Sequence, residues 1–206
     1  MQYLFDGVKE FLANDYIELK RHFHKIGKGQ KPHTLFIGCS DSRVVPNLIT
    51  RTLPGELFVI RNIANIVPRH RISKEFLATT SAVEYAVQVL NVENIIVCGH
   101  SNCGGCKAIY MDEKQTTDIP HTRKWLELMG KVKEQVATLG TNDELEKAVL
   151  TEQLNIVEQM NHLLSYPYIK ERYEQGKMNI LGWYYIIETG EVFNYDTELR
   201  RFEKIE

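Results

Sequence analysis

Three short, nearly continuous apolar runs constrain the fold of this 206-residue chain more than any other feature. They are residues 34–38 (TLFIG), 56–60 (ELFVI) and 94–98 (NIIVC), and turn-forming residues bound each of them. Such runs are typical of parallel strands that are covered on both faces. A helical pattern at residues 76–90 is long enough for a right-handed crossover between two of the strands. The sequence therefore predicts an α/β fold with a mostly parallel β-sheet core flanked by helices.

The C-terminal part of the chain predicts an antiparallel edge strand. Helical patterns at residues 122–139 and 143–164 precede a further apolar run at residues 179–187. That run and residues 192–195 flank a turn that contains Gly190, which is typical of a β-hairpin.

An amphipathic helix is predicted at the N-terminus. Apolar residues recur at three- and four-residue steps between residues 3 and 23. Gly27, Gly29 and Pro32 separate this helix from the first strand, so it could pack on its own domain or on a neighbouring subunit. We favour the neighbouring subunit.

Size and charge exclude several classes of protein. We expect a single domain over residues 1–206, with an N-terminal helical arm in residues 1–26 and an α/β core in residues 30–200. The net charge of -2 includes no dense run of Lys and Arg, so we expect no nucleic-acid partner and no membrane partner. No apolar run approaches the roughly 18 residues that span a bilayer, and the N-terminus does not match a signal peptide. A cytoplasmic location is therefore expected.

Cysteine and histidine follow two of the predicted strands. The sequence CSDSR (39–43) follows the first apolar run, and HSNCGGC (100–106) follows the third. Because ligands gather at the carboxyl ends of parallel strands, Cys39, His100 and Cys103 can converge there. Two thiolates and one imidazole suit tetrahedral zinc, and three protein ligands leave the fourth position open, as in catalytic zinc sites.

Other interpretations of the cysteines stay open at this point. The CGGC motif (103–106) could be a redox pair of the thioredoxin type, or half of a structural zinc site that Cys98 joins. A redox pair leaves Asp41, Arg43 and His100 without roles. We expect Cys98 and Cys106 to be packing residues. The remaining histidines lack ligand spacing and are expected at surface or capping positions: His22, His24, His33, His70, His121 and His162.

The two clusters resemble the paired zinc signature of the β-carbonic anhydrases. CSDSRV (39–44) and HSNCGG (100–105) match it, and PGE (54–56), RNIAN (61–65) and EYA (84–86) lie between them in that family's order. The similarity covers most of the chain. It implies a carbonate dehydratase that interconverts carbon dioxide and bicarbonate, with one Zn(2+) per subunit.

The resemblance also implies an assembly and a substrate pocket. Members of the family have a helical arm that embraces a second subunit, so we expect a homodimer or a dimer of dimers. Gln30, Phe58 and Tyr85 match the pocket residues of the plant-like branch, with Gln30 and Tyr85 reaching a neighbouring subunit's site. In the bicarbonate-inhibited branch a tryptophan helps to hold a regulatory bicarbonate. Here Phe36 stands in its place and lacks the indole donor, which argues against that regulation.

Asp41 and Arg43 are predicted to control the attacking water. They can form a charge-assisted pair in which Arg43 holds the carboxylate, so that Asp41 accepts the proton of the hydroxide and aims a lone pair at carbon dioxide. If Asp41 turns away and coordinates the zinc itself, the fourth position closes. The amide of Gly104, at the start of the next helix, could polarise the substrate oxygen.

Two alternatives to carbon dioxide hydration stay open from the sequence. One is a hydrolase of carbonyl sulfide or carbon disulfide on the same scaffold. The other is a noncatalytic zinc protein or a thiol redox protein.

Overall fold

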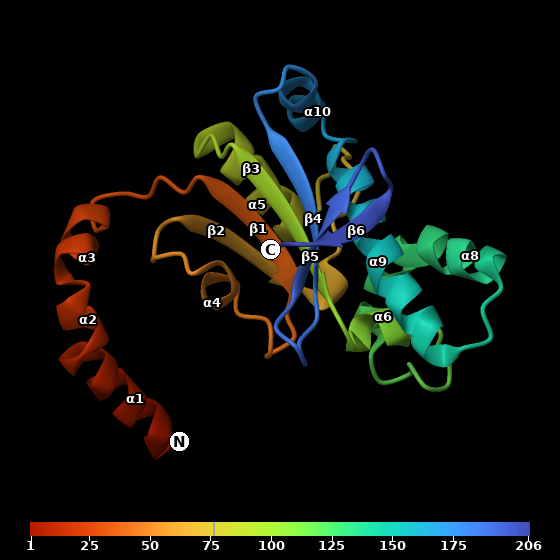
Figure 1. The fold of residues 1–206 in the computed structure, drawn as a ribbon, viewed down its shortest axis with the longest axis horizontal. Helices are drawn as coiled ribbons and strands as arrows, with labels where there is room; N and C mark the ends of the chain where they lie inside the picture. Colours follow the sequence, from red (N-terminus) through yellow and green to blue (C-terminus); the bar gives the residue numbers. More distant parts are fainter. Residues whose placement is uncertain (76) are drawn as a thin grey trace.

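The computed structural model describes residues 1–75 and 77–206, and a six-stranded sheet with the order β2-β1-β3-β4-β5-β6 lies at its centre (Figure 1). The strands are β1 (Thr34–Cys39), β2 (Leu57–Asn62), β3 (Asn94–His100), β4 (Asn179–Tyr185), β5 (Val192–Asp196) and β6 (Arg201–Lys204). The first four run parallel, and β5 and β6 continue the sheet antiparallel. The predicted α/β class is confirmed, and β6 is an antiparallel strand that the sequence analysis does not predict.

The helices occupy the connections between the strands and the N-terminal arm. They are α1 (Gln2–Ala13), α2 (Asp15–Glu18), α3 (Lys20–Ile26), α4 (Pro46–Thr50), α5 (Ala78–Glu84), α6 (Gly104–Ala108), α7 (Pro120–Leu126), α8 (Gly130–Leu139), α9 (Glu144–Leu163) and α10 (Pro167–Glu174). Shorter helical turns are η1 (Ile63–Asn65), the π-helical η2 (Tyr85–Val89) and η3 (Glu127–Met129).

The crossover helix begins and ends differently from the prediction. Phe76, at which that prediction begins, lies outside the described residues. The helix runs as α5 and then widens into the π-helical η2 before β3 begins. Tyr85, one of the predicted pocket residues, is the first residue of this π-helical turn.

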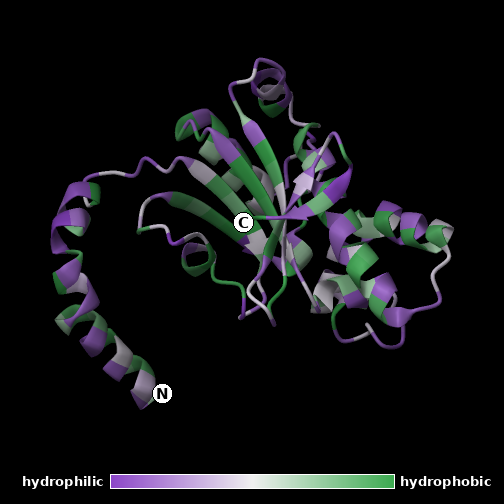
Figure 2. Cartoon of the chain, in the orientation of Figure 1, coloured by the Kyte–Doolittle hydropathy of each residue, from purple (hydrophilic) through white to green (hydrophobic). Residues whose placement is uncertain are grey.

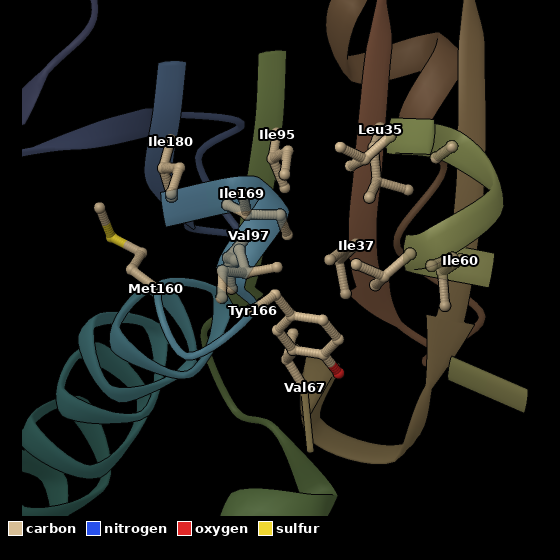
Figure 3. Close-up of a cluster of buried hydrophobic side chains, with 14 of the residues drawn as sticks. Leu35, Ile37, Ile60, Val67, Ile95, Val97, Met160, Tyr166, Ile169 and Ile180 are labelled. Carbon is tan, nitrogen blue, oxygen red and sulfur yellow. The ribbon is translucent and has the colours of Figure 1, made fainter. Parts of the chain in front are cut away.

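Apolar side chains cover both faces of the sheet. On one face, side chains of β1, β3 and β4 pack against α5, α9 and α10, and Figure 3 shows Leu35, Ile37, Ile95 and Val97 in this cluster beside Tyr166. The other face carries a smaller cluster around Phe36, Ile96 and Cys98. Because successive residues of a strand point to opposite faces, a continuous apolar run supplies both clusters at once.

Two glycines let α9 lie close against the sheet. A Cβ atom at Gly99 of β3 would lie 2.7 Å from Cγ1 of Ile156, and one at Gly182 of β4 would lie 2.5 Å from Sδ of Met160. Both distances are shorter than real carbon contacts, so larger residues would push α9 outward. This close approach brings α9 to the end of β3 at which His100 lies.

The N-terminal helices form an arm that extends away from the sheet (Figure 1). The predicted single helix is divided at Asn14 and Leu19 into α1, α2 and α3. Every residue of α1 is exposed, including Phe5, Val8 and Leu12. Apolar and polar segments alternate along the arm in Figure 2. The arm therefore presents an apolar stripe that its own sheet does not cover.

Within residues 1–75 and 77–206, none of the helices is both long enough and apolar enough to cross a membrane.

Candidate metal centre

The predicted ligands lie at neighbouring strand ends. Cys39 is the last residue of β1, and His100 is the last residue of β3, which pairs with β1 in parallel. Cys103 directly precedes α6, which starts after a tight turn in which Asn102 has a φ of 56°. All three side chains are buried. The topology therefore gathers residues that are far apart in the sequence.

The three ligand atoms have the spacing that one metal ion requires. They all lie within 4.8 Å of one another, and the sulfurs of Cys39 and Cys103 are 3.9 Å apart. Two sulfurs bound at about 2.3 Å with a tetrahedral angle between them would lie about 3.8 Å apart. The observed separation thus fits a shared zinc ion and is much longer than the roughly 2 Å of a disulfide bond.

His100 presents a free lone pair to this cluster. Its Nδ1 lies 2.9 Å from the carbonyl oxygen of Ser101 and must donate, because a carbonyl only accepts. The neutral ring then carries its proton on Nδ1, and Nε2 is the atom available for a metal. Nε2 is buried and has no hydrogen-bond partner among the described residues. A metal ligand role accounts for this otherwise costly arrangement.

The protein surroundings alone hold both thiols in the neutral form. A hydrogen bond with Cys103 and burial raise the pKa of Cys39 to about 12. The pKa of Cys103 is raised to about 12, first by a hydrogen bond with Cys106 and then by burial. A dication between the two sulfurs would favour the thiolates, so metal binding must release protons.

Asp41 and Arg43 form the predicted ion pair on the open side of the cluster. Arg43 donates from Nε to Oδ1 at 2.9 Å and from Nη2 to Oδ2 at 2.7 Å, in a bidentate geometry. Hydrogen bonds from Arg43 hold the pKa of Asp41 far below its usual range. Oδ2 of Asp41 lies 3.8 Å from Nε2 of His100. The carboxylate is thus close to His100 Nε2, ionised and turned toward Arg43.

The turn after β1 is fixed from the neighbouring strand. Arg61 of β2 donates from Nε to the carbonyl oxygen of Cys39 at 3.0 Å and from Nη2 to that of Asp41 at 2.6 Å. These bonds hold the backbone on both sides of Ser40 and so orient the thiol and the carboxylate together.

Comparisons with known proteins identify the family. Residues 34–192 match the family model described as carbonic anhydrase. A carbonic anhydrase of Helicobacter pylori (strain J99) is 46% identical over 98% of this chain and 93% of its own length. One of Synechococcus elongatus is 37% identical over 93% of this chain and 70% of its own length. The solved β-carbonic anhydrase CcaA superposes with a TM-score of 0.94 at 35% identity, over 100% of this chain and 99% of that chain.

This chain belongs to the β-class carbonic anhydrase family. Its reaction is accordingly the reversible hydration of carbon dioxide, and it is a carbonate dehydratase, a lyase. A tetrameric β-carbonic anhydrase of Sordaria macrospora has the same fold, with a TM-score of 0.81 at 30% identity over 99% of this chain and 95% of that chain.

A buried glutamate that is not predicted from the sequence anchors Cys103 in this β-carbonic anhydrase. Glu152 of α9 accepts the backbone N–H of Cys103 at 2.8 Å and the hydroxyl of Tyr184 at 2.8 Å. Its exposure is 2%, and burial raises its pKa. Glu152 therefore ties the loop of Cys103 to both α9 and β4.

The same face of α9 holds the segment that follows β2. Asn155 donates to the carbonyl oxygen of Ala64 at 2.9 Å, and Gln159 accepts the N–H of Val67 at 2.9 Å. His162 donates from Nδ1 to the carbonyl oxygen of Val67 at 2.7 Å. His162 is only 5% exposed, so the expectation of a surface or capping role for it is wrong. The available signal is the spacing of polar residues at positions 152, 155, 159 and 162, which places them on one helix face.

The predicted pocket residues lie at the opposite end of the sheet from the metal ligands of the same chain. Phe58 is four residues before Asn62, which pairs with Cys39, so it lies about 13 Å back along β2 at roughly 3.3 Å per residue. Its ring is 6.0 Å from that of Tyr85. Gln30 precedes β1, whereas Cys39 ends it. The structure therefore places Gln30, Phe58 and Tyr85 away from their own chain's metal cluster.

The start of α6 has one open glycine and one enclosed glycine. A Cβ atom at Gly104 would have open space around it, whereas one at Gly105 would lie 2.9 Å from the Cβ of Ala64.

Cys98 is a buried residue of β3, as expected, and burial raises its pKa to about 12. Phe36 is fully buried, with its ring 6.3 Å from that of Trp183.

Proposed function

We propose that this β-carbonic anhydrase hydrates carbon dioxide at one zinc ion per subunit, held by Cys39, His100 and Cys103. The observation that carries the proposal is the pair of sulfurs 3.9 Å apart beside a buried imidazole nitrogen with a free lone pair. This donor set favours zinc among the common divalent metals.

The residues around the cluster prepare water for attack. When bound, zinc supplies the Lewis acidity that makes water nucleophilic near neutral pH. Asp41 accepts a hydrogen bond from this water and aims its lone pair at carbon dioxide, and Arg43 holds the carboxylate in that position. Because Arg43 keeps the pKa of Asp41 very low, Asp41 orients the nucleophile and does not store a proton at neutral pH. The product proton must leave to solvent or buffer.

A closed state can arise from the same residues. If the Asp41 carboxylate leaves Arg43 and becomes the fourth ligand, water cannot bind and the enzyme is idle. The separation of 3.8 Å between Oδ2 of Asp41 and Nε2 of His100 supports this proposal, because it puts the carboxylate close to one of the three ligand residues. Crystal structures of the zinc-loaded enzyme across a range of pH test it, and water in the fourth position at every pH would contradict it.

A complete pocket requires a second copy of the chain. Gln30, Phe58 and Tyr85 lie far from the metal ligands of their own chain, so we propose that they line the pocket of a partner subunit together with the amide of Gly104. The exposed apolar stripe of α1 supports a homodimer that the arm embraces. The tetrameric relative supports a dimer of dimers.

Complementation between variants tests the shared pocket. Asp41→Asn and Tyr85→Ala damage different halves of the site, and each should lower the hydration rate by itself. If the site combines both subunits, dimers formed by refolding a mixture of the two variants contain one site with both defects and one intact site. Hydration should then recover above either variant alone. If mixing restores nothing, Tyr85 acts within its own chain or not at all.

The rest of the proposal concerns the chain as a whole. Residues 30–200 form the catalytic core and residues 1–26 the arm of a single domain. The four free, buried cysteines suit a reducing compartment, which supports a cytoplasmic location.

The decisive experiment measures zinc and hydration together. The purified protein should contain one zinc per chain and hydrate carbon dioxide in a stopped-flow assay, and Cys39→Ser should lose both. Cys98→Ala is the matched control, because Cys98 is also buried but belongs to the apolar cluster around Phe36 and Ile96, away from the proposed metal ligands. Zinc binding without hydration would favour a noncatalytic zinc protein. Rapid hydrolysis of carbonyl sulfide or carbon disulfide with slow hydration would favour the hydrolase.

A further inference from the structure

A third thiol adjoins the metal ligands and has no role in the proposed mechanism. Cys106 lies in α6, three residues after Cys103, and is 3% exposed. It packs in the same buried cluster as Cys39 and Cys103. Asn155 donates a long hydrogen bond of 4.0 Å to its sulfur.

The backbone between the two cysteines suits a disulfide bond. Residues three apart in a helical turn have Cα atoms about 5 Å apart. This separation falls within the roughly 4.4–6.8 Å that disulfides span. Cys103 is the N-cap and Cys106 lies in the first turn of α6, as in redox-active C-x-x-C motifs.

Cys106 also borders a cavity that neither of the other two cysteines lines. A cavity of about 350 Å³ between α6 and α9 is lined by Cys106, together with Lys107, Tyr110 and Glu152. Cys39 and Cys103 are not among the described residues that line it. An oxidant entering this cavity meets Cys106 before it meets either metal ligand.

We propose that Cys106 is a peroxide-reactive thiol whose oxidation withdraws Cys103 from the metal donor set as a Cys103–Cys106 disulfide. Hydrogen peroxide first converts the Cys106 thiol to a sulfenic acid and leaves as water, so the sulfur is oxidised by two electrons. The Cys103 thiolate then attacks the Cys106 sulfur, the S–O bond breaks, and the hydroxyl takes a proton from solvent and leaves as a second water. One peroxide is reduced for each disulfide formed.

The consequence for activity rests on the proposed function, in which Cys103 holds the metal. With Cys103 in a disulfide, only Cys39 and His100 remain, and a two-ligand set should release zinc. Reduction by a dithiol returns both thiols, so the inactivation is reversible when zinc is supplied. The enzyme thereby becomes responsive to peroxide through a residue that takes no part in hydration.

The competing product is a disulfide between Cys39 and Cys103, whose sulfurs are 3.9 Å apart. Tryptic digestion separates the two outcomes, because Cys39 lies on peptide 29–43, whereas Cys98, Cys103 and Cys106 share peptide 75–107. The Cys103–Cys106 bond makes peptide 75–107 lighter by two hydrogens. The competing bond links the two peptides.

The test treats the zinc-loaded enzyme with hydrogen peroxide, blocks the remaining thiols and maps the digest by mass spectrometry. Zinc release is followed with a chromogenic chelator, and hydration is followed in parallel. We expect peptide 75–107 to lose two hydrogens as zinc and activity disappear, and dithiothreitol with zinc to restore all three. Cys106→Ala should form no disulfide within this peptide, whereas Cys98→Ala should behave as the wild type.

Three results would overturn the proposal: a cross-link between the two peptides as the main product, an internal disulfide that persists in Cys106→Ala, or zinc loss without any disulfide. A different result would show that the proposed function is wrong. In that case the disulfide forms as described, but zinc content and hydration do not depend on the state of Cys103.

Discussion

Removing the Glu152 carboxylate should destabilise the enzyme through two specific buried donors. In Glu152→Ala the N–H of Cys103 and the hydroxyl of Tyr184 lose their acceptor together. Leaving a buried donor unsatisfied costs about 1–3 kcal/mol, so the two donors together cost about 2–6 kcal/mol. For a chain of this size each kcal/mol lowers the melting temperature by roughly 2–4 °C.

Glu152→Gln is the matched control, because it keeps the shape of the side chain. Its amide oxygen can still accept from Cys103, and the Tyr184 hydroxyl can rotate to accept from the amide nitrogen. It also removes a buried charge, whose desolvation raises the pKa of Glu152. We therefore expect a loss of less than about 1.5 kcal/mol, the net value of one hydrogen bond.

Guanidinium unfolding at a fixed free zinc concentration measures these differences, because bound metal itself stabilises the folded state. A double-mutant cycle with Tyr184→Phe isolates the second bond: Tyr184→Phe should cost about 1 kcal/mol in the wild type and much less beside Glu152→Ala. If Glu152→Ala proves as stable as Glu152→Gln, the carboxylate does not anchor the Cys103 loop, and the reasoning fails.

Three further predictions concern the site and its support. Asp41→Asn should keep its zinc and lose hydration by roughly 100-fold, because misplacing a reacting group costs about that much; stopped-flow rates and zinc analysis check this, and retained turnover would defeat the role assigned to Asp41. Gly105→Ala should destabilise by about 1–3 kcal/mol through its contact with Ala64, whereas Gly104→Ala should be neutral or stabilising; equal unfolding midpoints would contradict the difference. Stability should also fall as the pH drops from 7 to 4. The pKa of His162 is lowered, chiefly by burial. Below pH 6.5, the usual pKa of histidine, the unfolded chain therefore binds a proton more readily than the folded chain, and stability falls. Burial by itself raises the pKa of Glu158, but the positive charges of Lys131 and His162 outweigh it, so the pKa is lowered overall. The stability that the ionised carboxylate adds is therefore lost as the pH falls below about 4.5, the usual pKa of a glutamate. Glu158→Gln should show a smaller loss over this range, and an identical pH dependence would remove Glu158 as a cause.

The convergence of Cys39, His100 and Cys103 could be predicted from the sequence because their positions follow from topology. Cys39 and His100 follow apolar runs that are typical of parallel strands, and neighbouring parallel strands end at one edge of the sheet. Asp41 and Arg43 could be paired because they are two residues apart on one turn. Local patterns and one topological rule were therefore enough for these residues.

The arm and the crossover helix were predicted in type but not in detail. An apolar stripe at helical spacing does not reveal the interruptions at Asn14 and Leu19, where the backbone leaves the helix for a single residue. Nor does it reveal the π-helical turn at Tyr85. A periodic pattern of apolar residues records neither kind of local departure from regular α-helix.

Glu152 and His162 could not be assigned because the groups they bind, on Cys103, Tyr184 and Val67, are far away in the sequence. A glutamate or a histidine in a helix is usually solvent-exposed, and its burial depends on how closely that helix meets the sheet. Here Gly99 and Gly182 allow the close approach, and the polar spacing along α9 does not show how near the sheet lies. Close packing and polar anchoring therefore depend on each other. The glycines let α9 approach, and only at that distance can its polar face hold Cys103 by one end and the segment after β2 by the other.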